Sequence, residues 1–203
     1  SRPSCACIIW PRAARAARTD GDRYAAASGL AVRAGAIPEV SALVGDAGAG
    51  CVAAYASFDA EPGTSALRSL LALSGVRVLL PIIRDDGALD WGWDGEELVP
   101  RDHRLAIPEP APAGLPRGAD GLVAAGCRVV LVPALAVDVR GYRLGQGGGF
   151  YDRMLATLPA AEVGGPLRVA VVHDDEVLES VPREAHDRRM DAVLTPSRYE
   201  RLR

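Results

Sequence analysis

The sequence predicts an α/β protein with three layers, in which a mostly parallel sheet carries helices on both faces. The main evidence is a set of short, continuous apolar runs at 76–83, 128–134 and 167–173, which are typical of strands buried on both faces. Segments with helical spacing of apolar residues lie between them. The alternation indicates a Rossmann-like arrangement, in which ligands bind beyond the carboxyl ends of the strands.

Composition supports one globular domain spanning residues 1–203. Apolar residues make up 49% of the 203 residues, and 23 basic against 26 acidic residues give a net charge of −3. A near-neutral charge gives no general signal for nucleic acid. No apolar run approaches the roughly 18 residues that span a bilayer. We therefore expect small-molecule ligands, with no nucleic-acid or membrane partner, and a monomer.

Two features of residue usage narrow the chemistry and the compartment. The chain contains no lysine, so Schiff-base chemistry and a P-loop lysine are excluded. Its cysteines, Cys5, Cys7, Cys51 and Cys127, form no C-x-x-C pair, and two of them lie in apolar stretches. A disulfide framework or zinc site is therefore disfavoured, and a reducing, cytoplasmic setting fits better.

The N-terminal quarter is predicted to be helical. Residues 1–22 differ from the remainder, because R-A-A-R-A-A-R at 12–18 favours a helix that nearby prolines and a glycine interrupt. The Ala-rich segment 23–45 predicts one or two helices, which Pro38 would end or kink. A buried strand is expected at 51–57.

A second helix is expected between the first two strands. Thr64 is a suitable N-cap and Gly75 a suitable terminator. One face of this helix would carry Leu67, Leu70 and Leu71.

The middle of the chain predicts little helix. Residues 85–95 are typical of a turn and a short exposed strand, with Trp91 and Trp93 on one face. Segment 99–118 holds five of the fifteen prolines and is expected to be a long loop. A short last strand is possible at 191–195.

The most informative segment is a strand that runs into a glycine-rich loop and then a helix. The loop, 138–149, holds five glycines, and the helix is expected at 150–158. Glycines let backbone N–H groups approach an anion, and a helix N-terminus adds unpaired donors. Arg143 adds a positive charge suited to phosphate or carboxylate. On composition alone, a flexible connecting loop is an equally open interpretation.

This loop resembles the signature of a known family. The block R-L-G-Q-G-G-G-F-Y-D-R, preceded by V-P-A-L-A-V-D, is similar to that of 5-formyltetrahydrofolate cyclo-ligases, also called methenyltetrahydrofolate synthetases. Further pieces follow the family's order, over roughly residues 50–196. They are E-P-G-T from Glu61, V-L-L-P-I from Val78, I-P-E-P from Ile107 and V-P-x-E-x-H-D-x-x-x-D from Val181.

The resemblance implies an ATP- and Mg²⁺-dependent cyclisation of 5-formyltetrahydrofolate to 5,10-methenyltetrahydrofolate, with release of ADP and phosphate. The ATP-binding residues that it implies are Arg143, Leu144, Gly145, Gln146, Gly147, Gly148, Gly149, Phe150 and Tyr151. The substrate-binding residues that it implies are Ala56, Glu61, Gln146, Gly147, Gly148, Gly149 and Phe150.

By the same resemblance Asp152 and Asp187 would bind Mg²⁺ directly, and Asp191 is a candidate for supporting these ligands without touching the ion. Arg143 and Tyr151 would be catalytic. The alternatives are that Asp152 is an ordinary first-turn helix acid and that Asp187 only pairs with a neighbouring arginine. Trp91, Trp93 and Leu105 could line the substrate cleft or only pack in the core.

One departure concerns the N-terminus. Family members begin with a helix carrying K-x-x-x-R, whose lysine reaches ATP, and this chain has no lysine. Arg12, Arg15 or Arg18 would have to substitute, or nucleotide binding is weakened. A non-catalytic folate- or nucleotide-binding protein of the same fold therefore stays open. A different small-molecule kinase or phosphate-ester enzyme on a similar sheet is the third hypothesis.

Overall fold

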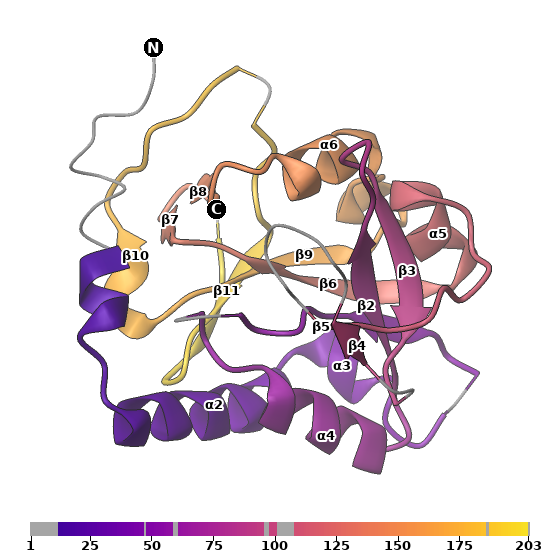
Figure 1. Ribbon diagram of the computed structural model, residues 1–203, viewed down its shortest axis with the longest axis horizontal. Coiled ribbons are helices and arrows are strands. Elements are labelled where there is room, and N and C mark those ends of the chain that lie inside the picture. Colours follow the sequence, from indigo (N-terminus) through magenta and orange to yellow (C-terminus); the bar gives the residue numbers. More distant parts are fainter. Residues whose placement is uncertain are drawn as a thin grey trace.

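A seven-stranded sheet runs through the computed structural model (Figure 1), which describes residues 12–46, 48–58, 61–95, 98–100, 108–185 and 187–202. Its strand order is β12-β11-β9-β6-β1-β2-β3. The inner strands from β11 to β2 pair in parallel, and each edge strand pairs antiparallel. The strands are β1 (Cys51–Ala53), β2 (Arg77–Ile83), β3 (Leu89–Trp93), β6 (Cys127–Pro133), β9 (Leu167–Val171), β11 (Ala192–Leu194) and β12 (Tyr199–Arg201).

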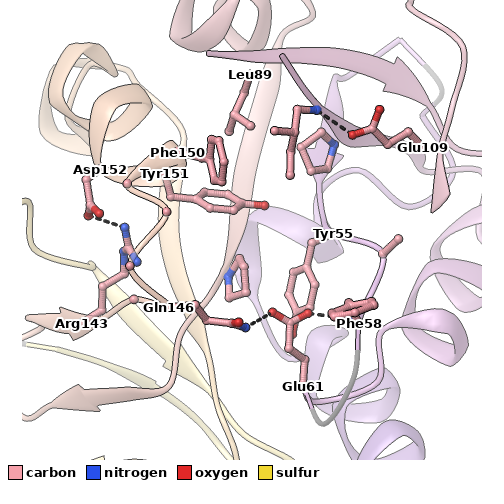
Figure 2. A pocket seen from close by; sticks show the side chains of 18 of the residues that line it. Tyr55, Phe58, Glu61, Leu89, Glu109, Arg143, Gln146, Phe150, Tyr151 and Asp152 are labelled. Carbon is pink, nitrogen blue, oxygen red and sulfur yellow. Dashed lines mark hydrogen bonds and ion pairs between the residues drawn. The ribbon is translucent and has the colours of Figure 1, made fainter. Parts of the chain in front are cut away.

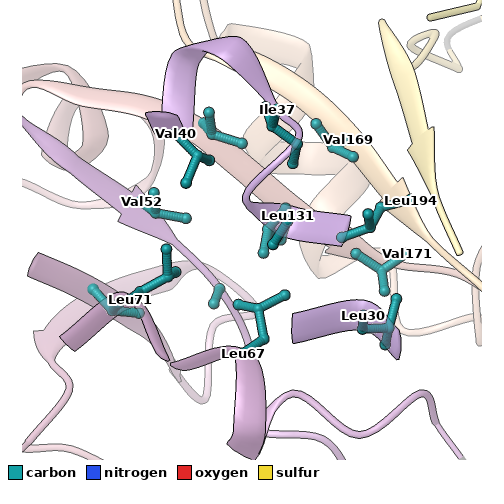
Figure 3. Close-up of a cluster of buried hydrophobic side chains, with 14 of the residues drawn as sticks. Leu30, Ile37, Val40, Val52, Leu67, Leu71, Leu131, Val169, Val171 and Leu194 are labelled. Atoms are coloured by element: carbon teal, nitrogen blue, oxygen red, sulfur yellow. The ribbon is translucent and has the colours of Figure 1, made fainter. Parts of the chain in front are cut away.

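Helices cover both faces of this sheet, which confirms the predicted three-layer α/β fold (Figure 1). On one face, α2 (Asp20–Ala34), α3 (Pro38–Ser41) and α4 (Ser65–Leu73) contribute Leu30, Val40 and Leu67 to a core shared with Leu131 and Val169. Figure 3 shows these side chains meeting between the helices and the strands. On the other face lie α5 (Gly118–Ala124) and α6 (Phe150–Thr157).

The strand order creates a switch point between β1 and β6. From β1 the chain moves to β2 on one side, and it later returns to the other side of β1 as β6. The loops that leave the carboxyl ends of β1 and β6 therefore diverge. In open α/β sheets such a divergence is where ligands bind.

Two small sheets stand beside the main one. The strands β10 (Val177–Leu178), β7 (Ala136–Asp138) and β8 (Arg143–Leu144) form one of them, and β4 (Val99–Pro100) and β5 (Pro108–Glu109) form the other. The predicted loop 138–149 is thus wrong in its first half, because β7 and β8 form a hairpin there. The free loop begins only at Gly145.

Several local predictions need correction. Pro38 begins α3 instead of ending a helix, since the first turn needs no N–H. Thr64 precedes α4, but its hydroxyl donates to the carbonyl of Tyr55 and does not cap the helix. Leu70 is exposed. Trp91 is buried in the core under α5, and its indole N–H donates to the carbonyl of Gly118 at 2.7 Å.

Candidate functional site

A cavity of about 390 Å³ opens at the switch point, beyond the carboxyl ends of β1, β2 and β6 (Figure 2). One side, here called the loop wall, consists of Arg143, Gly145, Gln146, Gly147, Gly148, Gly149, Phe150, Tyr151 and Asp152. The facing side, here called the strand wall, consists of Tyr55, Ala56, Phe58, Glu61, Pro81, Ile83, Leu89, Pro108 and Glu109. Arg12 and Pro133 also line the cavity. Of the direct ATP, substrate and metal ligands that the family resemblance implies, Leu144 and Asp187 do not line the cavity and the others do.

The conformation of the loop wall depends on its glycines. Gly147 and Gly149 have φ angles of +98° and +66°, which side chains rarely adopt. A Cβ on Gly148 would lie 2.5 Å from the Phe150 ring. Gly149 occupies the N-cap position of α6, and no side chain caps this helix. The first amides of α6 are therefore left for an anion in the cavity.

Arg143 and Asp152 form an ion pair at the edge of the loop wall (Figure 2). The Arg143 side chain is 5% exposed, whereas that of Asp152 is 39% exposed. The guanidinium is thus held in place by the first turn of α6, and the carboxylate keeps access to the cavity and to solvent. A buried arginine fixed in this way suits a phosphate.

The other predicted metal ligand lies elsewhere. Asp187 does not line the cavity, and its carboxylate accepts a hydrogen bond of 2.7 Å from the backbone N–H of Glu184. Asp191 accepts from the backbone N–H of Arg168 at 2.8 Å. Within the described ranges, no three His, Cys, Asp or Glu side chains gather as a metal site. Any metal at the loop wall would depend on Asp152 and on ligand oxygens.

A hydrogen bond joins the two walls. The Gln146 side-chain amide donates to one Glu61 oxygen at 2.7 Å, and the Phe58 backbone N–H donates to the other at 3.0 Å (Figure 2). The structure therefore brings Glu61 and the glycine loop together, although 85 residues separate Glu61 from Gln146.

Tyr151 points its phenol into the cavity between the walls (Figure 2). The phenolic oxygen is buried and has no hydrogen-bond partner among the described residues. Burial raises the pKa of Tyr151 well above its usual value, and the nearby negative charge of Glu61 raises this pKa further. The phenol therefore stays protonated at neutral pH and can donate a hydrogen bond to a ligand.

The structure separates the three N-terminal arginines. A short helix at 12–16 places Arg12 on the cavity. Arg15 is buried one turn later and makes two hydrogen bonds to the buried carboxylate of Glu176, at 2.7 and 2.8 Å. Arg18 pairs with Asp175. Only Arg12 is therefore placed to meet a ligand.

Sequence reasoning missed Glu109 as a site residue. The motif I-P-E-P was noted without a role for its glutamate, and the pattern carries no sign that this side chain faces a cavity. Conversely, neither Trp91 nor Trp93 lines the cavity. Trp91 packs in the core, and the Arg77 guanidinium lies 4.5 Å from the Trp93 ring centre. Leu105 lies outside the described residues.

Comparison with known proteins gives consistent results. The model of the 5-formyltetrahydrofolate cyclo-ligase family matches residues 12–196. A 5-formyltetrahydrofolate cyclo-ligase of Mycolicibacterium smegmatis is 46% identical over 154 residues, covering 72% of this chain and 74% of that protein. One from Escherichia coli is 34% identical over 152 residues, covering 72% and 78%.

Two solved structures share the fold. A 5,10-methenyltetrahydrofolate synthetase from Aquifex aeolicus superposes with a TM-score of 0.68 at 22% identity, over 98% of this chain and 92% of that one. The synthetase from Mycoplasma pneumoniae gives 0.64 at 14% identity, over 94% and 97%. The family match begins at residue 12, so it includes the helix that carries Arg12.

Proposed function

The chain belongs to the 5-formyltetrahydrofolate cyclo-ligase family, and on this premise we propose that it converts 5-formyltetrahydrofolate to 5,10-methenyltetrahydrofolate with hydrolysis of ATP to ADP and phosphate. One observation carries the proposal: a single cavity has the glycine-rich loop and Arg143 on one wall and Glu61 on the other, joined by Gln146. A triphosphate on the loop wall would therefore meet a folate on the strand wall.

In the proposed reaction, the formyl oxygen on N5 attacks the γ-phosphorus, and ADP leaves. N10 then attacks the iminium carbon and loses its proton, and the carbon–oxygen bond breaks to release phosphate. Such a transfer needs positioned donors and charge neutralisation more than covalent help. Arg143 and the amides between Gly147 and Tyr151 would provide both at the transferred phosphoryl group.

Tyr151 would donate a hydrogen bond from its phenolic O–H to an oxygen of the formyl phosphate. Its raised pKa keeps the phenol protonated. Its position between the walls would bring this donor to the place where the two substrates are proposed to meet. Because the phenol has no partner among the described residues, binding of substrate would satisfy a buried polar group. We assign Arg143 and Tyr151 as the catalytic residues.

Asp152 fits a magnesium ion held jointly with nucleotide phosphates and waters, because this ion takes one or two carboxylates at such sites. The bound ion would neutralise phosphate charge. Asp187 remains the proposed second ligand, although its carboxylate bonds to the Glu184 amide in this structure.

Arg12 would take the place of the lysine found in other family members. It lines the cavity, while Arg15 and Arg18 are engaged with Glu176 and Asp175. A guanidinium can bind phosphate through its planar fork, so this placement favours catalysis over the non-catalytic alternative.

A cytoplasmic monomer is the proposed setting. Cys51 and Cys127 are free and buried, as in a reducing compartment. In the part of the chain that the structure describes, no helix has the length and apolar character to cross a bilayer.

The direct test is formation of the methenyl chromophore by the full chain with 5-formyltetrahydrofolate, ATP and Mg²⁺. Asp152→Asn should abolish it. The control is Asp120→Asn, since Asp120 is also a first-turn helix acid but lies on α5. No product from the folded wild-type protein, with binding retained, would establish the non-catalytic alternative. Equal activity of the two variants would make Asp152 an ordinary helix acid.

A further inference from the structure

The helix at 12–16 that carries Arg12 is too short to hold its position alone. It makes little more than one turn, and a helix of this length is not stable in water without contacts elsewhere. No alanine at 13–17 belongs to the hydrophobic clusters that the described residues form. The place of Arg12 at the cavity therefore depends on the polar contacts of this helix with the rest of the chain.

Arg15 makes three such contacts. Its buried guanidinium donates to both carboxylate oxygens of Glu176, at 2.7 and 2.8 Å, and to the carbonyl of Ala134. A guanidinium bound at two points to one carboxylate has a fixed plane and a fixed direction. Because Arg12 and Arg15 are three residues apart, they are neighbours on the helix surface. The contacts of Arg15 therefore determine where Arg12 lies relative to the cavity.

The partners of Arg15 are themselves fixed near the cavity. Glu176 ends a short 3₁₀ turn after β9, and its carboxylate also accepts a hydrogen bond of 2.8 Å from the backbone N–H of His173. Ala134 directly follows Pro133, which lines the cavity. Figure 1 shows the first helix beside β10, which follows Glu176 directly. Both partners thus come from segments that leave the carboxyl ends of β6 and β9.

We propose that Arg15 and Glu176 are positioning residues for nucleotide binding and that they act through Arg12. The assignment rests on the proposed function, because it takes ATP as the ligand that Arg12 meets. Neither Arg15 nor Glu176 lines the cavity, so an effect on the nucleotide has to pass through the helix. A planar guanidinium binds phosphate from a defined direction, unlike the point charge of a lysine. The position of the helix therefore matters for Arg12.

The test is a double-mutant cycle on the full chain. Glu176→Gln keeps the size of the side chain and one oxygen, but it removes the charge that pairs with Arg15. It is made alone and together with Arg12→Ala. Asp94→Asn is the matched control, because it breaks another two-point pair, with Arg68, outside the cavity. Calorimetry with MgATP and with 5-formyltetrahydrofolate gives both dissociation constants without any need for turnover.

We expect Glu176→Gln to raise the dissociation constant for MgATP about tenfold, as Arg12→Ala should, because both remove the same contact with the nucleotide. In the Arg12→Ala protein the same change should add less than about twofold. The dissociation constant for 5-formyltetrahydrofolate should stay the same. Asp94→Asn should lower the unfolding temperature and leave both constants unchanged. If Glu176→Gln fails to fold, Arg15→Lys takes its place in the cycle, since it keeps the charge without the fork.

An equal loss of MgATP binding with and without Arg12 would overturn the proposal, because a general structural effect does not depend on this residue. Unchanged MgATP binding by Glu176→Gln, or a parallel loss of folate binding, would overturn it as well. If the cycle shows coupling but the wild-type protein forms no methenyl product, the proposed reaction fails and the positioning role stands. If product forms but the two effects are independent, only the positioning role fails. If the wild-type protein does not bind MgATP, both proposals fail.

Discussion

The two walls of the cavity are built by opposite means. The loop wall is one continuous segment, and its binding groups are backbone amides together with the paired Arg143. The strand wall is assembled from the segment that follows β1 and from residues of β2, β3 and β5, and its charged groups are the side chains of Glu61 and Glu109. The first wall is suited to anions and the second to hydrogen-bond donors, so the two sides of the cavity favour different ligand groups.

The largest effect should come from the backbone of the loop wall. In Gly149→Ala, the new Cβ meets a φ of +66° and lies 2.8 Å from the Arg153 guanidinium. The positive φ costs about 1–2 kcal/mol. Displacement of the amides should add to this, so we expect the KM for ATP to rise about 100-fold.

The control for this change is Gly164→Ala. Gly164 also has a positive φ, +89°, but nothing lies within 4 Å of its Cβ position. It should lose similar stability in thermal unfolding and keep its KM. If Gly149→Ala lowers stability but leaves the KM for ATP unchanged, the amides of the loop wall do not bind nucleotide.

The second effect contrasts one tyrosine from each wall. Tyr151→Phe removes a phenolic hydroxyl that has no hydrogen-bond partner among the described residues, so stability should not fall. The loss of this donor should lower kcat about 10- to 100-fold. Tyr55→Phe removes a hydrogen bond of 3.1 Å to the carbonyl of Pro62, so stability should fall by about 1 kcal/mol. Denaturant unfolding and product absorbance measure the two quantities. A Tyr151→Phe protein with normal kcat would remove this residue from catalysis.

Arg12 should matter for the nucleotide and not for the folate. Arg12→Ala should raise the KM for ATP about tenfold, as for a charge-assisted contact, and leave the KM for the folate unchanged. Arg12→Lys should restore most of the loss. Arg18→Ala, which breaks the ion pairs with Asp175 and Glu176 outside the cavity, is the matched variant. If both alanine variants change the KM for ATP equally, Arg12 does not replace the lysine found in other family members.

The smallest effect concerns the link between the walls. Gln146→Ala removes the exposed hydrogen bond to Glu61, which is worth about 0.5–1.5 kcal/mol. The KM for folate should therefore rise no more than about tenfold. Arg117→Ala, which breaks an exposed pair with Asp86, gives the background level. A change in the KM for ATP larger than that for folate would mean that Gln146 serves the loop wall only.

The sequence allowed the loop wall to be predicted but only part of the strand wall. A glycine-rich segment between a strand and a helix is a local pattern, and its backbone geometry depends on residues within the segment, Gly147, Gly148 and Gly149. Glu109 depends instead on the pairing of β5 with β4 and on the place where β2 ends. No local pattern records such contacts, so its position required the fold.

The helices and strands divide in the same way. Continuous apolar runs predicted β2, β6 and β9 within about two residues, because burial on both faces leaves a strong signal. The hairpin of β7 and β8 does not follow from the sequence pattern, because its strands are only three and two residues long and tertiary contacts determine them. Trp91 alternates with Trp93 as an exposed strand would, but α5 covers it.

The pair formed by Arg15 and Glu176 has a consequence for any shortened form of this protein. The guanidinium also donates to the carbonyl of Ala134, directly beyond β6. The helix at 12–16 is therefore attached to the end of β6 by a hydrogen bond and to Glu176 by an ion pair. Replacing Arg15 alone would leave Glu176, which is 0% exposed in the intact protein, without this partner, and breaking such a buried pair costs about 3–5 kcal/mol. A protein shortened to begin at Thr19 would also lack Arg15, so we expect its free energy of unfolding to be lower than that of the full chain.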